Sequence, residues 1–356
     1  MRQDVLQDRS NIKVILMGRF AKYQIVSKII DSGLIPIFYQ NDLEVSKKIV
    51  QACVDGGSEI VEFTNRGDLA YEVFVGIAKW CADNVPQVAL GVGSVVDPGT
   101  AALYINSGAN FVVSPIVNAE VAKICNRRQV AYLPGCGTVS EISAAEELGA
   151  ELIKIFPGEE MGGPKFIKDL LGPIPWAKIV PTGGVDTTWE SVSAWIQAGA
   201  ASLGIGSRLI SKEMVAAGNY DGIRKKVEDS LGWVKKARGT PLFLGVEHVG
   251  VYPTKNIDPA ELATWYAETF GFKKNDGTSS FFLSGKGPGR IEIMKEPSEH
   301  PCHIAVKVSN FEEACKYLAD RGIEVEEPKL KKAAKAVFLK SPDKVGNRIQ
   351  LINHIS

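Results

Sequence analysis

Lys154 stands out because of the residues around it. It lies in the middle of a short, nearly continuous apolar stretch, Leu-Ile-Lys-Ile-Phe, at residues 152–156. Burying an ammonium group is unfavourable unless it is paired or its pKa falls until the amine is neutral. A neutral amine attacks carbonyl carbons, so a lysine in this setting suits Schiff-base chemistry. Taken alone, the stretch favours the simpler alternative, a lysine that extends to the rim of the fold or pairs with a carboxylate.

A second apolar stretch supplies a carboxylate. It ends in Val-Glu-Phe-Thr-Asn-Arg, which places Glu62 in the stretch and Arg66 four residues later. If Glu62 and Lys154 face the same space, they form either an acid–base pair or a structural ion pair. Buried ion pairs contribute little to stability, which favours the first reading.

Two glycine-rich segments occur later in the chain, Pro-Thr-Gly-Gly at 181–184 and Gly-Ile-Gly-Ser at 204–207. Glycine lets backbone N–H groups approach an anion closely, and a helix that follows adds a favourable dipole. Each segment alone fits a plain turn as well as it fits a phosphate site. Together they favour a phosphate site.

The elements that position these residues alternate between β-rich apolar runs and helix-patterned segments, after a first helical segment at about 19–31. Short apolar strands between helices are typical of a parallel α/β sheet. Eight such units in about 200 residues fit a compact (β/α)8 barrel, or TIM barrel, better than an open doubly wound sheet, which remains the alternative. The strands are expected near 34–38, 59–63, 89–91, 111–113, 130–133, 152–155, 178–180 and 202–204.

A barrel would bring the polar residues together. Chemistry in such barrels lies at the C-terminal ends of the strands, and alternate strands share a layer of inward side chains. Glu62 on the second strand and Lys154 on the sixth are then expected to point into one central space. The glycine-rich segments follow strands seven and eight, where such barrels often bind phosphate.

Composition narrows the class of protein. The 356 residues carry 41 basic and 41 acidic side chains, which gives no reason to expect nucleic acid or a membrane as a partner. No apolar run is long enough for a membrane span, and the N-terminus lacks the apolar core of a secretory signal. Six separated cysteines without a Cys-x-x-Cys pair suit a reduced, cytoplasmic protein.

The first part of the chain resembles the 2-keto-3-deoxy-6-phosphogluconate (KDPG)/4-hydroxy-2-oxoglutarate (KHG) aldolases. The resemblance covers about residues 1–235 and rests on ordered matches that include Gly-Ser-Glu-Ile-Val-Glu-Phe-Thr-Asn-Arg at 57–66, Gly-Val-Gly-Ser-Val at 91–95, Val-Ser-Pro at 113–115, Ile-Lys-Ile-Phe-Pro at 153–157 and Pro-Thr-Gly-Gly-Val at 181–185. It implies a metal-independent class I aldolase that releases pyruvate and an aldehyde from a small 2-keto acid, and a homotrimer.

The resemblance also implies roles for individual residues. Lys154 would be the Schiff-base lysine and Glu62 the proton shuttle. The substrate would be held by Arg66, Ser94, Pro115, Phe156 and Thr182, and its phosphate by Gly183, Gly184, Gly206 and Ser207. Asn65, Ile155 and Gly158 depart from the usual family residues, which leaves open which 2-keto acid and which aldehyde the pocket prefers.

The chain changes character after a predicted linker at 235–241, so we expect one domain at 1–238 and a smaller α+β domain at 239–356. The second domain shows a strand–helix–strands pattern twice, which predicts paired βαβββ modules. It resembles the vicinal oxygen chelate superfamily, which includes glyoxalase I, extradiol dioxygenases and bleomycin-resistance proteins. The resemblance rests on Glu-His-Val-Gly-Val at 247–251, Arg-Ile-Glu-Ile-Met at 290–294, His-Ile-Ala-Val at 303–306 and Arg-Ile-Gln-Leu at 348–351.

In metal-binding members of that superfamily, the ligands lie on the first and last strand of each repeat. Here those positions hold His248, Glu292, His303 and Gln350, a set that suits Zn²⁺, Ni²⁺, Mn²⁺ or Fe²⁺. The alternative is a metal-free binding or assembly module. For the barrel, the alternatives to an aldolase are an isomerase or epimerase without a covalent intermediate and a non-catalytic sugar-phosphate sensor.

Overall fold

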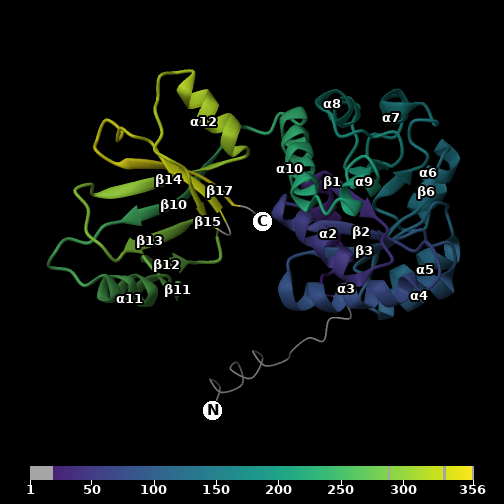
Figure 1. Cartoon of the computed structure of the whole chain (residues 1–356), viewed down its shortest axis with the longest axis horizontal. Helices are drawn as coiled ribbons and strands as arrows, with labels where there is room; N and C mark the ends of the chain where they lie inside the picture. Colours follow the sequence, from purple (N-terminus) through teal and green to yellow (C-terminus); the bar gives the residue numbers. More distant parts are fainter. Residues whose placement is uncertain (1–18, 288, 332–333, 355–356) are drawn as a thin grey trace, which may run out of the picture. The chain divides into compact units, whose positions relative to one another are not determined.

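The computed structural model describes residues 19–287, 289–331 and 334–354. The chain divides into two compact units, Met1–Arg238 and Gly239–Ser356, which are described separately (Figure 1). No helix among the described residues has the length and apolar character needed to cross a membrane.

The first unit is built on parallel strands. Its strands are β1 (Leu34–Phe38), β2 (Ile60–Thr64), β3 (Ala89–Gly93), β4 (Phe111–Val113), β5 (Ala131–Leu133), β6 (Gly135–Cys136), β7 (Ile153–Ile155), β8 (Ile179–Pro181) and β9 (Leu203–Ile205). They pair in the orders β5-β4-β3-β2-β1-β9 and β6-β7-β8. All the strand pairs described for this unit are parallel.

These two runs of strands are connected at both ends. Only Pro134 separates β5 from β6, so one continuous segment takes part in both sheets. At the other end, Thr182 forms an isolated parallel bridge with Gly204, and Ala201 N–H donates to Ile179 O at 2.8 Å. The result is a curled parallel sheet with alternating βα units, which fits a TIM-like fold and confirms the predicted α/β class.

Helices connect the strands and lie around them (Figure 1). The helices are α1 (Lys22–Ser32), α2 (Leu43–Asp55), α3 (Ala70–Asn84), α4 (Pro98–Asn106), α5 (Ala119–Arg127), α6 (Val139–Glu147), α7 (Gly163–Leu170), α8 (Trp189–Gln197), α9 (Lys212–Ala216) and α10 (Tyr220–Ala237). Several begin at a polar side chain that accepts a hydrogen bond from a first-turn N–H group, as Asp42, Asp97 and Thr138 do. The first helix ends at Gly33, whose φ of 70° is the left-handed conformation that glycine adopts readily.

Strand alternation divides the apolar side chains of this unit into two cores. One core lies between the strands and the outer helices and includes Val61, Val92 and Ile153. The other contains the alternate strand positions together with α1, and includes Ile35, Ile60, Leu152 and Val180. The second core therefore marks the inner face of the curled sheet.

The predicted linker begins too early in the sequence. Helix α10 continues through Ala237, because Leu231 and Val234 in its last turns are buried against the first unit. Arg238 then donates hydrogen bonds to Asp31 O and Ala201 O, which fixes the end of the helix.

The second unit is a mixed eight-stranded sheet in the order β11-β12-β13-β10-β14-β17-β16-β15. Its chain order is strand, helix and three strands, twice over. The first half comprises β10 (Phe243–Val251), α11 (Pro259–Phe270), β11 (Lys273–Asp276), β12 (Ser280–Ser284) and β13 (Arg290–Met294). The second comprises β14 (Cys302–Val308), α12 (Phe311–Ala319), β15 (Lys329–Lys331), β16 (Ala334–Phe338) and β17 (Arg348–His354).

Candidate active site and candidate metal centre

Lys154 and Glu62 occupy the inner face of the first unit. Lys154 on β7 is two positions after Leu152, and Glu62 on β2 is two positions after Ile60; both of these apolar residues belong to the inner core. Because strand side chains alternate, the two polar residues continue the same inward series. Both are buried, with 7% of Lys154 and 2% of Glu62 exposed.

The two groups influence each other's protonation. Burial lowers the pKa of the Lys154 amine, the charge of Glu62 opposes this, and Arg66 adds to it. Burial likewise raises the pKa of the Glu62 carboxyl, which the positive charges of Lys154 and Arg66 partly offset. The shifts move both groups toward their neutral forms, which for Lys154 is the nucleophilic form.

Two glycines on neighbouring strands leave room for the side chains of Glu62 and Thr182. A Cβ on Gly93 would lie 1.9 Å from Oε1 of Glu62, and one on Gly204 would lie 2.4 Å from Oγ1 of Thr182. Sequence reasoning did not single out Gly93 as functional, and it included Gly204 only in a segment expected to bind phosphate. The signal that would have found them is a glycine at an inward position of a buried strand, beside a strand that carries a polar inward residue.

The other residues expected to hold substrate lie at the ends of the strands. Arg66 is exposed and its Nε donates to Ser94 Oγ at 3.5 Å, which links the ends of β2 and β3. Ser94 adopts a left-handed backbone conformation with a φ of 62°. Phe156 lies directly after β7, and the Nζ of Lys154 is 4.8 Å from the centre of its ring. Thr182 follows β8 and is half-buried; Pro115 follows β4, and its backbone would contact a Cβ on Gly135.

The four residues expected to hold phosphate follow β8 and β9. Gly183 and Gly184 have φ angles of 88° and 80°, a conformation that L side chains rarely adopt. Gly206 and the exposed Ser207 follow β9 directly. Ser207 also lines an open cavity of about 510 Å³, together with Asp186, Arg208, Ser211, Lys212, Glu213 and Lys226.

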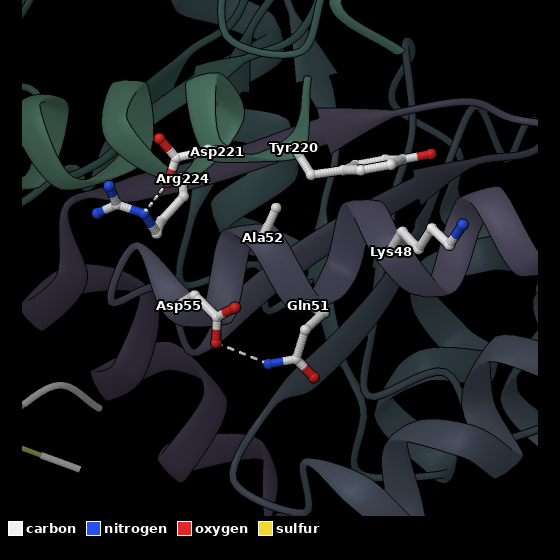
Figure 2. A pocket seen from close by; sticks show the side chains of 7 residues that line it. All are labelled: Lys48, Gln51, Ala52, Asp55, Tyr220, Asp221 and Arg224. Atoms are coloured by element: carbon white, nitrogen blue, oxygen red, sulfur yellow. Dashed lines mark hydrogen bonds and ion pairs between the residues drawn. The ribbon is translucent and has the colours of Figure 1, made fainter. Parts of the chain in front are cut away.

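A second hollow, of about 330 Å³, lies on the outer helices α2 and α10 (Figure 2). None of the predicted site residues lines it. Its polar groups are largely paired with one another: Gln51 donates to Asp55 at 2.7 Å, and Arg224 donates to Asp221 at 2.8 Å. We do not assign the chemistry to this hollow.

In the second unit, three of the four predicted metal ligands converge. His248, Glu292 and His303 are buried, and one ligand atom from each lies within 4.8 Å of the others. The Nε2 atoms of the two histidines are 3.0 Å apart, and Glu292 Oε2 is 3.0 Å from His248 Nε2 and 3.3 Å from His303 Nε2. These spacings suit three atoms that share one cation at about 2.0–2.2 Å.

The carboxyl group of this cluster is held in its ionised form. Burial alone would raise the pKa of Glu292, but hydrogen bonds from His248, His303 and Ser280 outweigh this and lower it. Two imidazoles and a carboxylate form a donor set that divalent transition metals prefer, so the residues fit such an ion.

Gln350 lies on the same face of the sheet as this cluster. It pairs with Ala305 on β14, two residues after His303, and directly opposed residues of paired strands share a face. Its position in the second half matches that of Glu292 in the first: Glu292 is opposite Gly250, two residues after His248. The register is consistent with a fourth ligand at Gln350, which stays a prediction.

Comparison with known proteins identifies both units. Residues 25–226 match the family model described as KDPG and KHG aldolase, and residues 247–351 match the glyoxalase/bleomycin resistance protein/dioxygenase superfamily. The KHG/KDPG aldolase of Escherichia coli K12 is 28% identical over 206 residues, which is 57% of this chain and 92% of the relative.

Two solved structures resemble the first unit at 25% identity, each with a TM-score of 0.52. One is the KDPG aldolase of Legionella pneumophila, described with pyruvate captured as a covalent carbinolamine; the match covers 57% of this chain and 95% of that one. The other is the KDPG aldolase of Zymomonas mobilis ZM4, described with 3-phosphoglycerate; the match covers 60% of this chain and 97% of that one.

Proposed function

Because the chain belongs to the KDPG and KHG aldolase family of carbon–carbon lyases, we propose that its first unit, residues 1–238, is a class I aldolase built on a closed eight-stranded barrel. Its substrate is a 2-keto-3-deoxy-6-phospho sugar acid or 4-hydroxy-2-oxoglutarate. The products are pyruvate and an aldehyde, glyceraldehyde 3-phosphate or glyoxylate. The observation that carries the proposal is the buried pair of Lys154 and Glu62 on the inner face of the curled sheet.

The reaction begins at Lys154. Its neutral amine adds to the C2 ketone, and loss of water from the carbinolamine gives an iminium ion. Glu62 removes the proton of the C4 hydroxyl group, the C3–C4 bond breaks, and the electron pair moves into the iminium to form an enamine as the aldehyde leaves. The enamine then takes up a proton at C3, and hydrolysis releases pyruvate and restores the amine. The iminium is the electron sink, so no step calls for a metal.

The residues at the strand ends bind and orient the substrate. Arg66, held by Ser94, pairs with the substrate carboxylate, while Pro115, Phe156 and Thr182 line the pocket. The backbone N–H groups of Gly183, Gly184, Gly206 and Ser207 bind the phosphate. As in the family that the chain resembles, we expect a homotrimer, which light scattering after gel filtration measures.

Covalent trapping tests the aldolase mechanism. The protein is incubated with pyruvate, reduced with borohydride and analysed by intact mass and peptide mapping. We expect one adduct on Lys154 that is lost in Lys154→Ala and kept in Lys178→Ala, since Lys178 is exposed and precedes β8. Turnover of the candidate substrates without an adduct would favour an isomerase-like acid–base site, and neither turnover nor adduct would favour a sugar-phosphate sensor.

For the second unit, residues 239–356, we propose a divalent metal centre in paired βαβββ modules. The convergence of His248, Glu292 and His303 favours this second function. Zn²⁺, Ni²⁺, Mn²⁺ or Fe²⁺ bound there would act as a Lewis acid toward a ligand oxygen, and the three side chains, with Gln350 as a fourth ligand, would hold it. Metal analysis of the protein after dialysis against each ion tests this. We expect one ion per chain, no binding in His303→Ala, and weaker binding in Gln350→Ala.

A further inference from the structure

The two imidazoles of the metal centre are supported in matching ways. In the first half, His248 is opposite Arg290, and in the second half, His303 is opposite Arg348. Each arginine lies over a phenylalanine ring, Arg290 over Phe282 at 5.4 Å and Arg348 over Phe338 at 3.9 Å. Each of these rings in turn meets its histidine edge-on, at interplanar angles of 90° and 86°.

In each half, one oxygen-bearing side chain connects the arginine to Nδ1 of the histidine. In the first half this is Glu247, which is hydrogen-bonded to Nδ1 of His248 and forms an ion pair with Arg290. For His303 of the second half it is Tyr252, which follows β10 of the first half; its hydroxyl lies 3.1 Å from Nδ1 of His303 and is hydrogen-bonded to Arg348. The two Nδ1 atoms are thus occupied, which leaves the two Nε2 atoms to face Glu292.

Glu247 reaches His248 because β10 is irregular at this point. Neighbours along a regular strand point to opposite faces, so Glu247 and His248 would be directed apart. The pairing of β10 with β14 shifts between Val246 and His248, which marks a β-bulge. A bulge redirects a side chain, and here the carboxylate of Glu247 lies beside the imidazole of the next residue, only 9% exposed.

The carboxylate of Glu247 and the hydroxyl of Tyr252 differ in the protonation states that they allow at Nδ1 of the histidine they contact. A carboxylate that pairs with a guanidinium, as Glu247 does with Arg290, only accepts hydrogen bonds, so its contact with His248 requires a proton on Nδ1 of that ring. A hydroxyl donates or accepts, so the contact with Tyr252 allows Nδ1 of His303 either with or without its proton. The proton on one ring nitrogen determines whether the other is available as a metal ligand.

We propose that Glu247 and Tyr252 are the positioning residues of the metal centre, and that they act unequally. Glu247 keeps the proton on Nδ1 of His248 whether or not an ion is bound, so that Nε2 of this ring is the ligand atom. Tyr252 orients His303 without fixing its proton. This inference rests on the proposed metal centre for its effect on affinity, but the proton on His248 is a property of the metal-free protein as well.

The test is ¹⁵N NMR of the full chain labelled at histidine, with and without Zn²⁺. The chain has four histidines, and His300→Gln removes one ring system. His354 is kept, because its Nε2 lies 3.0 Å from Oε1 of Glu247, and its signals are identified by comparison with a separate His354→Gln sample. We expect a protonated Nδ1 for His248 in both states, and a mixture of Nδ1 states for this ring in Glu247→Gln, whose amide both donates and accepts. A wild-type His248 with its Nδ1 unprotonated would overturn the inference.

Zinc affinity, measured by competition with a chromophoric chelator, supplies the second readout. We expect a loss of roughly 10- to 100-fold in Glu247→Gln, the range typical for partners of metal-bound histidines. The loss in Tyr252→Phe should be smaller, because charge-assisted hydrogen bonds are the stronger kind. The matched control is Glu324→Gln, which removes an exposed carboxylate that pairs with Lys340 in the same unit.

The outcomes distinguish the positioning role of Glu247 from the existence of the metal centre. Equal zinc affinity in Glu247→Gln and Glu324→Gln would overturn the positioning role, although the metal centre would stand. If the wild type binds none of the four ions, the metal centre fails, and the positioning role fails with it. The Nδ1 signals would then show separately whether Glu247 fixes the proton of His248.

Discussion

Gly93 and Glu62 are matched across neighbouring strands: a Cβ at position 93 would lie 1.9 Å from Oε1 of the carboxylate. The two residues face each other because Thr64, two positions after Glu62 on β2, pairs with Gly93 on β3. The carboxylate therefore occupies space that any other residue at position 93 would fill.

Gly93→Ala is expected to displace the carboxylate and to reduce the rate of aldol cleavage, roughly by the 10²- to 10⁴-fold typical of a misplaced general base. Overpacking of the site should also cost about 1–3 kcal/mol of unfolding free energy. Steady-state kinetics and urea denaturation measure the two effects. Gly287→Ala in the second unit is the control, since a Cβ there meets no atom within 4 Å; equal rates in the two variants would contradict the role of Gly93.

The pH dependence of adduct formation should shift in opposite directions in two variants. The amine of Lys154 attacks pyruvate only when neutral, so trapping slows as the pH falls through its pKa. The charge of Glu62 raises that pKa and the charge of Arg66 lowers it. Glu62→Gln should therefore move the acid limb to lower pH, and Arg66→Gln should move it to higher pH. The rate of borohydride trapping at a series of pH values measures this; shifts in the same direction would contradict the assigned electrostatics.

Removal of metal is expected to leave aldol cleavage unchanged. The iminium on Lys154 supplies the electron sink, so a chelator should affect only the second unit. That unit should lose stability on chelation, by about 2.7 kcal/mol relative to protein in metal at 100 times its Kd. Calorimetry with and without a chelator, alongside the lyase assay, measures both. A parallel loss of lyase activity on chelation, restored by the metal, would contradict the separation of the two chemistries.

Gly250→Ala is expected to abolish metal binding and to leave the lyase activity intact. A Cβ at position 250 would lie 1.8 Å from Cε1 of His303, so the imidazole has to leave its place. Gly287→Ala in the same unit is the control, because a Cβ there meets no atom within 4 Å. Zinc titration of both variants measures the effect. If Gly250→Ala binds zinc as tightly as the control, His303 is not a ligand in this position.

The sequence predicts most of this fold because its strands are buried and apolar. The runs at 34–38 and 111–113 are found as strands with the predicted bounds. The βαβββ pattern implies three strands after the helix, but the bounds of the first of them, β11, were not predicted. Its residues Lys273–Asp276 are polar and exposed, so the strand depends on pairing with β12 and leaves no apolar pattern in the sequence.

The candidate sites were predictable to the extent that they depend on residue type in a regular strand. Lys154 and Glu62 could be identified because a charge in an apolar strand is conspicuous. Glu247 could not, because a regular strand would direct it away from His248. Its position depends on a shift in strand pairing that only the three-dimensional structure reveals. The space that Gly93 and Gly250 leave for neighbouring side chains likewise depends on which residues lie beside them across the strands.

The bulge in β10 also has a consequence for selectivity. Two halves built on the same strand pattern would give a cation two equivalent imidazoles, and a ligand with two oxygen atoms would then bind equally well either way round. One irregularity beside His248 sets a carboxylate behind one ring, while a phenol stands behind the other. The two imidazoles would then be donors of different strength toward a bound cation, and a two-oxygen ligand on that cation would have a preferred orientation. A site built from two similar halves would in this way distinguish the two ends of its ligand.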